Sequence, residues 1–509
     1  MLQTILRYAL IILFFSTLPG CSDKTPEDFR AATFAKLNQI KTHRMGVIVS
    51  YLDGLREKAT GAAEDPVFVE FFEQFYLKQP NEQGNSTGFL TRSDALDRHY
   101  VDRYSEFYDV LFVNNSGKIF NSIKMEWDYG KSIFGEQLAG TKLARALRAD
   151  PDVGFVDFDF YSPSEESASF FVTRVPSANG PLGWLVFQFS VNTINSVLAD
   201  FEDLGVTGEV YLTNREKLMM TQSRLVPADT TLNLSVNTVS LTQALDRGEI
   251  SGDMVIDDYR GVRVFSSFEK FEFESVTWVI VAEIDEEEVV TNHYRANKDF
   301  FLPRIVGKLG KGATKTPPRR LKEAEKTRVD INEFARGGAE STLVTYGVAT
   351  CTAVIVTYPQ KFGYLGHINP LDASYHSGFS KFLLDIREAI VGKDRLDAGD
   401  LLGRMLAKIR YYDIPPHEIQ KIRVNVVAIH TDSFEKVIDK LLDAGLFLSQ
   451  IQLVYGPDER YANILNDVGA GTIFVEWVGA DAVSSNWTTT EKTPNLGSVV
   501  QQISGYTPK

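Results

Sequence analysis

The chain has 509 residues, of which 44% are hydrophobic and 24% are charged, as expected for a folded protein with two or three domains. Its formal net charge of -14 repels the phosphates of nucleic acids, which argues against a nucleic-acid partner. Binding of small molecules, catalysis and attachment to a membrane remain as candidate functions.

Residues 1–20, MLQTILRYALIILFFSTLPG, combine one basic residue with the apolar run Tyr8–Leu18. This run is shorter than the about 20 residues that cross a bilayer, so it is typical of a secretory signal peptide. Leu18-Pro19-Gly20-Cys21 resembles the lipobox of bacterial lipoproteins, which implies that Cys21 is acylated and anchors the protein to a bacterial membrane. An uncleaved anchor and a plain secreted protein are the alternatives. All three place the chain outside the cytoplasm, facing the periplasm.

A long helix and several hairpins are predicted next. From Pro26 to Thr60 an irregular apolar stripe follows an acidic start, which favours a helix. The segment YDVLFVNNSGKIFNSI has apolar strands on both sides of Asn-Asn-Ser-Gly and predicts a hairpin. A second hairpin-rich block ends in DYRGVRVFSSFEKFEFESVTWVIVAEIDEEEV, and a helix is predicted between the two blocks at 191–200.

Residues 27–290 resemble the double Cache (PDC-like) sensor domain of bacterial receptors. The matching phrases are YDVLFVNNSGKIFNSI, DFDFYSPSEESASFFVTRVP, NTINSVL with GVTGEVYLTNREKLMMTQSR, DYRGVRVFSSF and WVIVAEIDEEEV. The resemblance implies a long N-terminal helix that carries two PAS-like lobes, at 27–200 and 201–295. It also implies a small-molecule pocket in the first, membrane-distal lobe, for an amino acid or a carboxylate-like ligand.

Ligand pockets combine aromatic walls with a few polar anchors. On this basis the candidate ligand-binding residues are Tyr108, Trp127, Tyr129, Asp157, Asp159 and Tyr161. Asp157 and Asp159 alternate along a predicted strand and would share one face, where two carboxylates suit a cationic ammonium group. Packing explains any one of the six residues equally well, and the two aspartates could simply be solvated.

Residues 296–332 are predicted to form a basic linker, because the stretch 303–330 is rich in Lys, Arg, Gly and Pro. Its basic residues are Lys308, Lys311, Lys315, Arg319, Arg320 and Lys322. They could contact anionic lipid or a cell-wall polymer, or they could be solvated. No apolar run of membrane length follows the second lobe.

Strand and helix signals alternate over residues 333–509. The segments 343–358 and 364–368 look extended, and 379–390 and 401–409 favour helices. The later segments KIRVNVVAIH, SFEKVIDKLLDAG, LSQIQLVYG and GAGTIFVEWV follow a βαβ-type order. This order predicts a layered α/β domain, so the whole chain is expected to be α/β (α+β) in class.

Cys351 follows three small residues and precedes an apolar run. A cysteine nucleophile needs a nearby base, and the base needs a third group that fixes its orientation. His367 lies sixteen positions after Cys351, beyond the turn 359–363, so a hairpin would bring it back towards the cysteine. Thr345 precedes Cys351 by six positions and could form a hydrogen bond with the imidazole.

The segment TYGVATCTAVIVTYPQKFGYLGHINP resembles the chemoreceptor glutamine deamidase family, CheD, and the similarity extends loosely over residues 335–480. The resemblance implies that Thr345, Cys351 and His367 are catalytic, that the substrate is a glutamine side chain of a protein, and that no cofactor is needed. The sequence contains no cluster of His, Cys and carboxylate residues at metal-ligand spacing.

Two other interpretations remain open for the C-terminal region. Cys351 could be a buried small hydrophobic residue in a binding protein whose C-terminal domain has lost its activity. A cysteine peptidase or a transglutaminase would need the same thiolate and histidine, because hydrolysis and acyl transfer pass through the same thioester. The leading hypothesis is an exported, lipid-anchored protein that joins a double Cache sensor to a CheD-like deamidase domain.

Overall fold

The computed structural model describes residues 28–77, 94–178, 180–199, 203–323, 326–369, 401–410, 414, 416–431, 434–481 and 484–506. These residues form two compact units. The N-terminal unit comprises residues 30–289, and the C-terminal unit comprises the chain from residue 290 together with Phe29. Helices combine with sheets whose strands are mostly antiparallel, so the predicted α+β class is confirmed. The predicted lipidation residue Cys21 lies outside the described residues.

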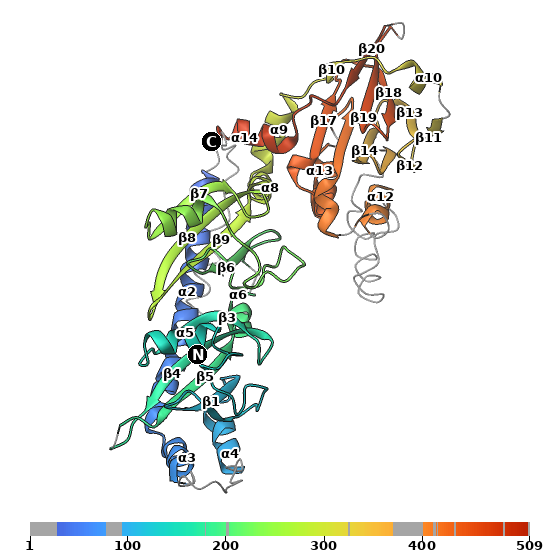
Figure 1. Ribbon diagram of the computed structural model, residues 1–509. Helices are drawn as coiled ribbons and strands as arrows, with labels where there is room; N and C mark the ends of the chain where they lie inside the picture. Colours follow the sequence, from blue (N-terminus) through green and yellow to red (C-terminus); the bar gives the residue numbers. More distant parts are fainter. Residues whose placement is uncertain are drawn as a thin grey trace, which may run out of the picture. The chain divides into compact units, whose positions relative to one another are not determined.

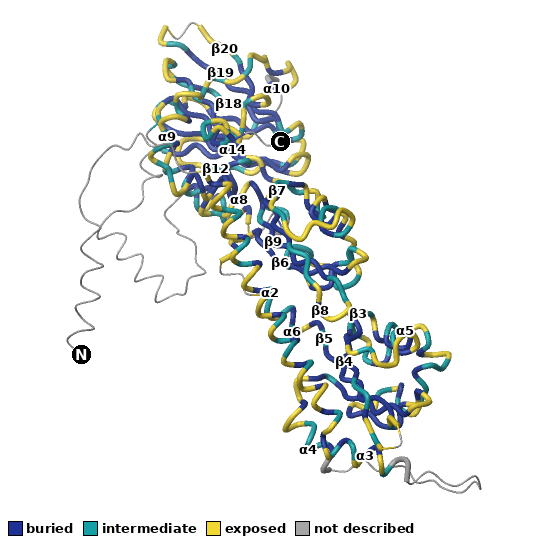
Figure 2. The backbone as a smooth tube through the Cα atoms, turned by 90° about the vertical axis from the view of Figure 1, so that its left-hand side faces the viewer, coloured by how far each residue is buried: buried dark blue, intermediate teal, exposed yellow. Residues whose placement is uncertain are grey.

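The N-terminal unit is built along helix α2 (Phe29–Gly61), which confirms the predicted long helix and runs beside both sheets of the unit (Figure 1). Apolar side chains at helical spacing, among them Ile48, Leu52 and Leu55, are buried on one face of this helix (Figure 2). Lys41 is only 1% exposed and donates hydrogen bonds to Ser267 Oγ (3.0 Å) and to the carbonyl oxygen of Phe268 (3.1 Å). The helix is therefore fixed to the second lobe by a buried cation.

The first lobe contains a five-stranded antiparallel sheet in the order β2-β1-β5-β4-β3. Its strands are β1 (Asp109–Asn114), β2 (Ile119–Ser122), β3 (Phe155–Tyr161), β4 (Glu166–Val175) and β5 (Gly183–Ser190). Its helices are α3 (Pro66–Leu77), α4 (Asp94–Arg103), α5 (Lys142–Ala149) and α6 (Asn192–Leu198). One face of the sheet packs on α5 through an apolar core that includes Leu111, Leu143 and Phe170. The predicted hairpin at the start of the lobe is β1–β2.

The second lobe contains a four-stranded antiparallel sheet in the order β6-β9-β8-β7. Its strands are β6 (Glu209–Thr213), β7 (Ser251–Asp257), β8 (Arg263–Phe273) and β9 (Val276–Asp285). Its helices are α7 (Val239–Leu241), which continues into a π-helical turn at Thr242–Asp246, and α8 (Glu286–Ala296), which leads out of the lobe. The predicted arrangement of a long helix with two lobes is thereby confirmed.

The C-terminal unit contains two sheets that enclose a shared apolar core. One sheet has the order β12-β15-β14-β16-β17 and the other β10-β20-β19-β18-β13-β11. The bounds of the first sheet are β12 (Glu333–Gly338), β14 (Thr352–Tyr358), β15 (Phe362–Ile368), β16 (Arg423–Ala428) and β17 (Ile451–Tyr455). Those of the second are β10 (Ala313–Thr314), β11 (Lys326–Arg328), β13 (Thr342–Val348), β18 (Tyr461–Asp467), β19 (Thr472–Val478) and β20 (Ser485–Thr489).

Three amphipathic helices, α12 (Leu401–Lys408), α13 (Phe434–Asp443) and α14 (Leu496–Ile503), pack against this part of the chain with buried apolar faces. Helix α12 contacts β12, β15 and α13, and α14 contacts β17. Helices and two sheets thus form layers, as the βαβ-type sequence order predicted. The helix predicted at 379–390 lies outside the described residues.

The structure differs from the predicted linker at 296–332. This segment contains α9 (Lys298–Val306) and α10 (Arg319–Glu323), and its short strands join the six-stranded sheet, where β10 pairs with β20 and β11 with β13. Three of its basic residues form ion pairs within the C-terminal unit: Lys311 pairs with Glu459, Lys315 with Glu491 and Arg320 with Asp467.

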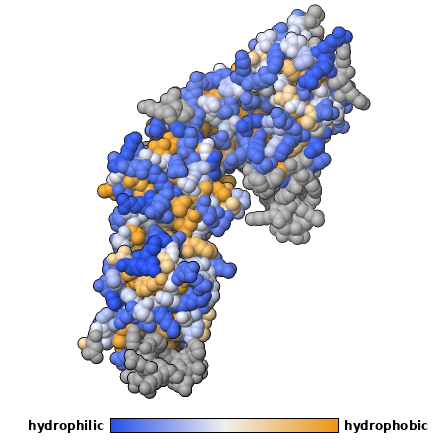
Figure 3. Space-filling view, in the orientation of Figure 1, coloured by the Kyte–Doolittle hydropathy of each residue, from blue (hydrophilic) through white to orange (hydrophobic). Residues whose placement is uncertain are grey.

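The visible surfaces are mostly hydrophilic, with scattered hydrophobic residues (Figure 3). Within the described ranges, every helix is too short or too polar to span a lipid bilayer.

Candidate functional site

One face of the first-lobe sheet changes from apolar to polar along its strands. Alternate residues of a strand point to the same face. On β1, Asp109 therefore lies on the same face as Leu111, and on β5, Gln188 lies on the same face as Val186. Asp109 and Gln188 are direct neighbours across the two strands, and both are fully buried. On β4 the same face continues from Phe170 through Ala168 to Glu166. Polar side chains therefore line the end of a sheet face whose other part is the core of the lobe.

The loop that follows β2 adds two more carboxylates, those of Glu126 and Asp128. Tyr108 donates a hydrogen bond to Glu126 Oε1 (2.7 Å), and Tyr161 donates one to Asp128 Oδ2 (2.7 Å). Ser122 Oγ donates to Asp109 Oδ2 at 2.7 Å. We refer to Asp109, Glu126, Asp128 and Glu166 as the acid cluster.

Burial raises the pKa of Asp109, Glu126 and Asp128, and hydrogen bonds from neighbouring hydroxyl and amide groups oppose this rise. The negative charges of Asp109, Asp128 and Glu166 raise the pKa of Glu126 further. Likewise, the charge of Asp109 raises the pKa of Asp128, whereas the charge of Lys131 lowers it. Within the described ranges, no group of His, Cys, Asp and Glu residues has a geometry that could hold a metal ion.

Two predicted ligand-binding residues, Tyr108 and Tyr161, belong to this site through their bonds to Glu126 and Asp128. Trp127 lies at its rim: the side chain is 41% exposed, and its Nε1 donates to the carbonyl oxygen of Ser162 at 3.1 Å. Tyr129 is half-buried in the same loop. Sequence reasoning missed Asp109, Glu126, Asp128, Glu166 and Gln188. Glu126 and Asp128 could have been found from the segment MEWDYG, where they flank the candidate residue Trp127.

The prediction that Asp157 and Asp159 form a pair on one strand face is not supported by the structure. The β3–β4 register shifts between Val156 and Asp159, which interrupts the alternation. Asp157 is buried, where it accepts hydrogen bonds from Lys142 Nζ (3.0 Å) and from Trp278 Nε1 of the second lobe (2.9 Å). Asp159 lies 3.6 Å from Arg145 and is partly exposed. Each aspartate has its own cation and its own surroundings.

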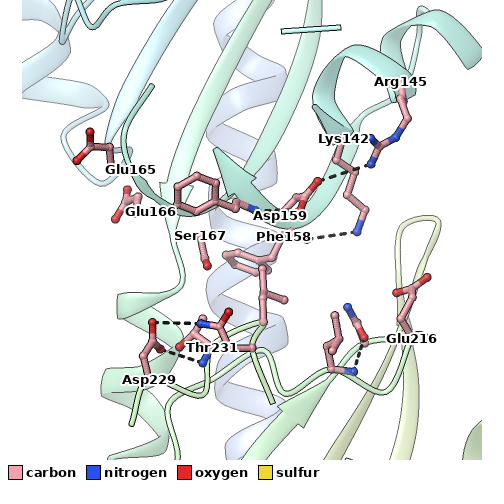
Figure 4. Close-up of a pocket in the computed structure, with 15 residues that line it drawn as sticks. Lys142, Arg145, Phe158, Asp159, Glu165, Glu166, Ser167, Glu216, Asp229 and Thr231 are labelled. Carbon is pink, nitrogen blue, oxygen red and sulfur yellow. Dashed lines mark hydrogen bonds and ion pairs between the residues drawn. The ribbon is translucent and has the colours of Figure 1, made fainter. Parts of the chain in front are cut away.

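A separate cavity of about 580 Å³ lies between the two lobes (Figure 4). Figure 4 shows Lys142, Arg145, Asp159 and Glu166 on the side of the first lobe, opposite Asp229, Thr231 and Glu216 of the second. Both cations in its wall form ion pairs, with Asp157 and Asp159. Glu166 belongs to this wall and to the acid cluster, so the two regions are adjacent.

The different surroundings of the two aspartates lead to a prediction about stability. Asp157→Ala is expected to lower the unfolding free energy of the N-terminal unit by about 2–3 kcal/mol, because it leaves the buried Trp278 Nε1 without an acceptor. Asp159→Ala is the matched control, with an expected loss of about 0.5 kcal/mol or less for an exposed ion pair. Calorimetric unfolding of the full chain measures both. Equal effects would contradict this role of Asp157.

In the C-terminal unit, the hairpin β14–β15 brings His367 back towards Cys351. Ala353 pairs with His367, and Cys351 directly precedes β14 and belongs to the same core cluster as Ala353. This places Cys351 near the position diagonal to His367. Side chains in diagonal positions lie about 7–8 Å apart at their backbones, within reach of a long side chain. Cys351 and His367 are 5% and 3% exposed. Cys351 also belongs to the apolar core between the two sheets, which agrees equally with a packing role.

The hydrogen bonds of Thr345 fix the tautomer of His367. Thr345 Oγ1 donates its only proton to the carbonyl oxygen of Val329 (2.8 Å), so it accepts a bond from His367 Nδ1 at 2.7 Å. Nδ1 therefore carries the proton and Nε2 has a free lone pair. Burial lowers the pKa of His367 and thus favours the neutral ring, and the negative charge of Asp330 opposes this effect. Nε2 is buried without a partner in the part of the chain that the structure describes.

No protein-family model matches the chain, and no curated protein matches it. Among solved structures, the ligand-binding domain of the amino-acid chemoreceptor PctC of Pseudomonas aeruginosa PAO1, in complex with GABA, is 18% identical. The match covers 50% of this chain and 100% of that domain, with a TM-score of 0.33. The PctB domain of the same organism with L-Arg is 13% identical over 52% of this chain and 93% of that one, with a TM-score of 0.35.

The ligand-binding domain of the chemoreceptor CtaA of Pseudomonas fluorescens, in complex with L-leucine, is also 13% identical. That match covers 51% of this chain and 98% of that domain, with a TM-score of 0.34. Each of these matches covers about half of this chain.

Proposed function

We propose that the N-terminal unit is an extracytoplasmic sensor that binds a small molecule, such as an amino acid, in its first lobe. The observation that supports this proposal is the buried polar end of the sheet face, where Asp109, Asp128 and Gln188 are each fully buried. Burying such groups costs free energy unless hydrogen bonds satisfy them, and some of their oxygen atoms have no partner among the described residues. A bound ligand would supply the missing bonds.

Isothermal titration of the full chain with a panel of small molecules tests this proposal. The panel contains GABA, L-arginine and L-leucine together with amines, dicarboxylates and neutral amides. We expect at least one compound to bind with a Kd below about 1 mM and to raise the melting temperature. Asp128→Asn should weaken this binding at least tenfold. Ligand binding that Asp128→Asn leaves unchanged would place the site elsewhere and refute the proposal.

A second proposed function, cysteine-dependent deamidation, is supported by the neutral His367 whose Nε2 carries a lone pair on the sheet face of Cys351. His367 would take the thiol proton, and the Cys351 sulfur would attack the carbonyl carbon of a glutamine carboxamide. The protonated imidazole would give its proton to the departing amide nitrogen, which leaves as ammonia. Water would then cleave the thioester, releasing glutamate and the thiol. Alkylation of Cys351 by iodoacetamide, compared between the wild type and His367→Ala, tests the pair.

The proposed location also includes a lipid on Cys21, as the lipobox resemblance implies. Incorporation of radiolabelled palmitate into the full chain, and its loss in Cys21→Ser, is the expected result. Labelling that persists in Cys21→Ser would refute the lipid anchor and leave both proposed activities unaffected.

A further inference from the structure

The unsatisfied atoms of the first-lobe site are all hydrogen-bond acceptors. In the part of the chain that the structure describes, these buried oxygens lack a partner: Glu126 Oε2, Asp128 Oδ1, Glu166 Oε1 and Gln188 Oε1. Three are carboxylate oxygens and the fourth is an amide oxygen. A ligand that completes this site must therefore bring N–H or O–H donors rather than acceptors.

The orientation of the Gln188 amide follows from its neighbour Ser164. The Ser164 hydroxyl donates its proton to the carbonyl oxygen of Tyr161 (3.3 Å), so it accepts the bond from Gln188 Nε2 at 2.8 Å. The amide oxygen is consequently the unsatisfied end. Gln188 is fully buried and directly opposite Asp109. Its unsatisfied amide oxygen therefore indicates, independently of the carboxylates, that the site lacks a hydrogen-bond donor.

The second lobe can be compared with the first, because its sheet also begins with a buried acidic residue that accepts a hydrogen bond from a serine. Asp109 and Glu209 are the first residues of β1 and β6, and each accepts a hydrogen bond from a serine, Ser122 in the first lobe and Ser223 in the second. Across the sheet, Asp109 faces Gln188, just as Glu209 faces Glu283.

In the second lobe, however, side chains of the lobe itself complete the site. Glu209 accepts bonds from Ser223 and Tyr259, and Glu283 accepts bonds from Ser266 (2.7 Å) and Tyr211 (3.1 Å). No oxygen of these two glutamates is left without a partner. The same polar end is therefore filled in one lobe and incomplete in the other.

The charges specify the ligand further. The acid cluster contributes four carboxyl groups, of which Asp109, Asp128 and Glu166 act electrostatically on Glu126. The nearby cations Lys124 and Lys131 lie over the rings of Tyr108 (5.0 Å) and Trp127 (4.3 Å). These lysines are at the partly exposed rim, whereas Asp109 and Asp128 are fully buried. A ligand carboxylate would meet like charges in the interior, while a cation would be stabilised there.

We propose that the first lobe binds an organic cation with several N–H donors, such as an alkyl diamine or a guanidinium compound, and that a carboxylate on the ligand is not required. This inference rests on the proposed sensor function and narrows its ligand class. Ammonium and guanidinium groups satisfy both demands of the site, since they carry positive charge and are donors only.

The test compares matched ligands that differ by one carboxylate. Agmatine and L-arginine share the guanidinium group, and putrescine and L-ornithine share two amino groups. Isothermal titration of the full chain at pH 7.5 should give agmatine and putrescine Kd values at least tenfold lower than those of their carboxylated counterparts. Asp128→Asn should weaken the binding of agmatine at least tenfold. Glu209→Gln, at the filled position of the second lobe, is the matched control and should leave this binding unchanged.

The possible failures are distinguishable. If L-arginine or L-ornithine binds more tightly than its decarboxylated partner, the ligand class is wrong while the sensor function stands. If no cation binds but a neutral or anionic compound does, the result is the same. If no compound of the whole panel binds, both the ligand class and the sensor function fail. Tighter binding of the amines that persists in Asp128→Asn also overturns the inference, because the acid cluster would not be the site.

Discussion

Replacing His367 by alanine is expected to slow the alkylation of Cys351 by iodoacetamide about a hundredfold at pH 7, the usual size of a general-base contribution. The thiolate is the reactive form of cysteine, and the apolar core around Cys351 disfavours an isolated thiolate. We propose that His367 Nε2, which has no hydrogen-bond partner among the described residues, takes the thiol proton. Labelling of the full chain followed by peptide mass spectrometry measures the rate at Cys351 itself.

Thr345 supplies a control of the same experiment at a second residue. Thr345→Val keeps the shape of the side chain but removes the acceptor for His367 Nδ1–H, so the imidazole loses its fixed tautomer. We expect about tenfold slower alkylation in Thr345→Val, and a nearly normal rate in Thr345→Ser, which retains the hydroxyl group. Labelling in urea should be equal for all variants, because the difference depends on the folded arrangement.

The pH profile separates a base from a packing residue. Because burial lowers the pKa of His367 below its ordinary value of 6.5, the neutral base should persist into the mildly acidic range. Alkylation should therefore fall only at a pH below 6.5, and this step should vanish in His367→Ala. Slow labelling that is equal in wild type and His367→Ala would identify Cys351 as a core residue and refute the deamidase proposal.

Replacing Glu283 by glutamine is expected to stabilise the N-terminal unit at pH 8.5 by about 3–5 kcal/mol. Glu283 on β9 is 1% exposed and lies directly opposite Glu209 on β6. Burial, together with the charges of Glu209 and Asp258, raises the pKa of Glu283 to about 8. Between about pH 4.5 and pH 8, Glu283 is thus protonated in the folded protein but ionised in the unfolded chain.

The direction of the pH dependence follows from this difference. The folded-state pKa is above the unfolded value near 4.5, so the contribution of Glu283 to stability is fully present below about pH 4.5. It is lost progressively as the pH rises through about 8. Glutamine cannot ionise, and the variant should lack this loss while its amide still accepts a bond from Ser266 or Tyr211.

Hydrogen exchange of the β6 and β9 amides at pH 6 and pH 8.5, corrected for intrinsic rates and read by mass spectrometry, measures this effect in the full chain. Ser267→Ala, next to Ser266 but bonded to Lys41, is a control whose effect should not depend on pH. If Glu283→Gln gave no greater stabilisation at pH 8.5 than at pH 6, the pKa of Glu283 would not be raised in the folded state, and the interpretation of the pair would be wrong.

The elements that the sequence predicted correctly depend on local periodicity. Helix α2 and the hairpins β1–β2, β8–β9 and β14–β15 each have an apolar pattern within a single segment. The segment 296–332 was misjudged because strands of two or three residues have no pattern of their own. These short strands form only because they pair with other strands of the sheet: β10 pairs with β20, which lies far away in the sequence, and β11 pairs with β13.

The acid cluster was beyond sequence reasoning for a related reason. Its members come from β1, β4 and a loop, and Gln188 joins them from β5 only through the register of the sheet. The bulge that separates Asp157 from Asp159 likewise depends on the β3–β4 pairing. In contrast, the hydrogen bond between Thr345 and His367 is predicted from the position of Thr345 six residues before Cys351 and from the resemblance of their segment.

Helix α2 gives the two lobes a common mechanical element. With 33 residues it is about 50 Å long, and Lys41 fixes it to β8 while its later turns carry the buried side chains Leu52 and Leu55. The hydrogen bond from Trp278 to Asp157 connects the two lobes at a second point. A displacement of the first-lobe sheet would thus act on helix α2, on the Trp278–Asp157 bond and on the ring contacts of Phe155 with Phe273 and Trp278. Asp157→Ala would remove the hydrogen bond and leave the helix and the ring contacts in place.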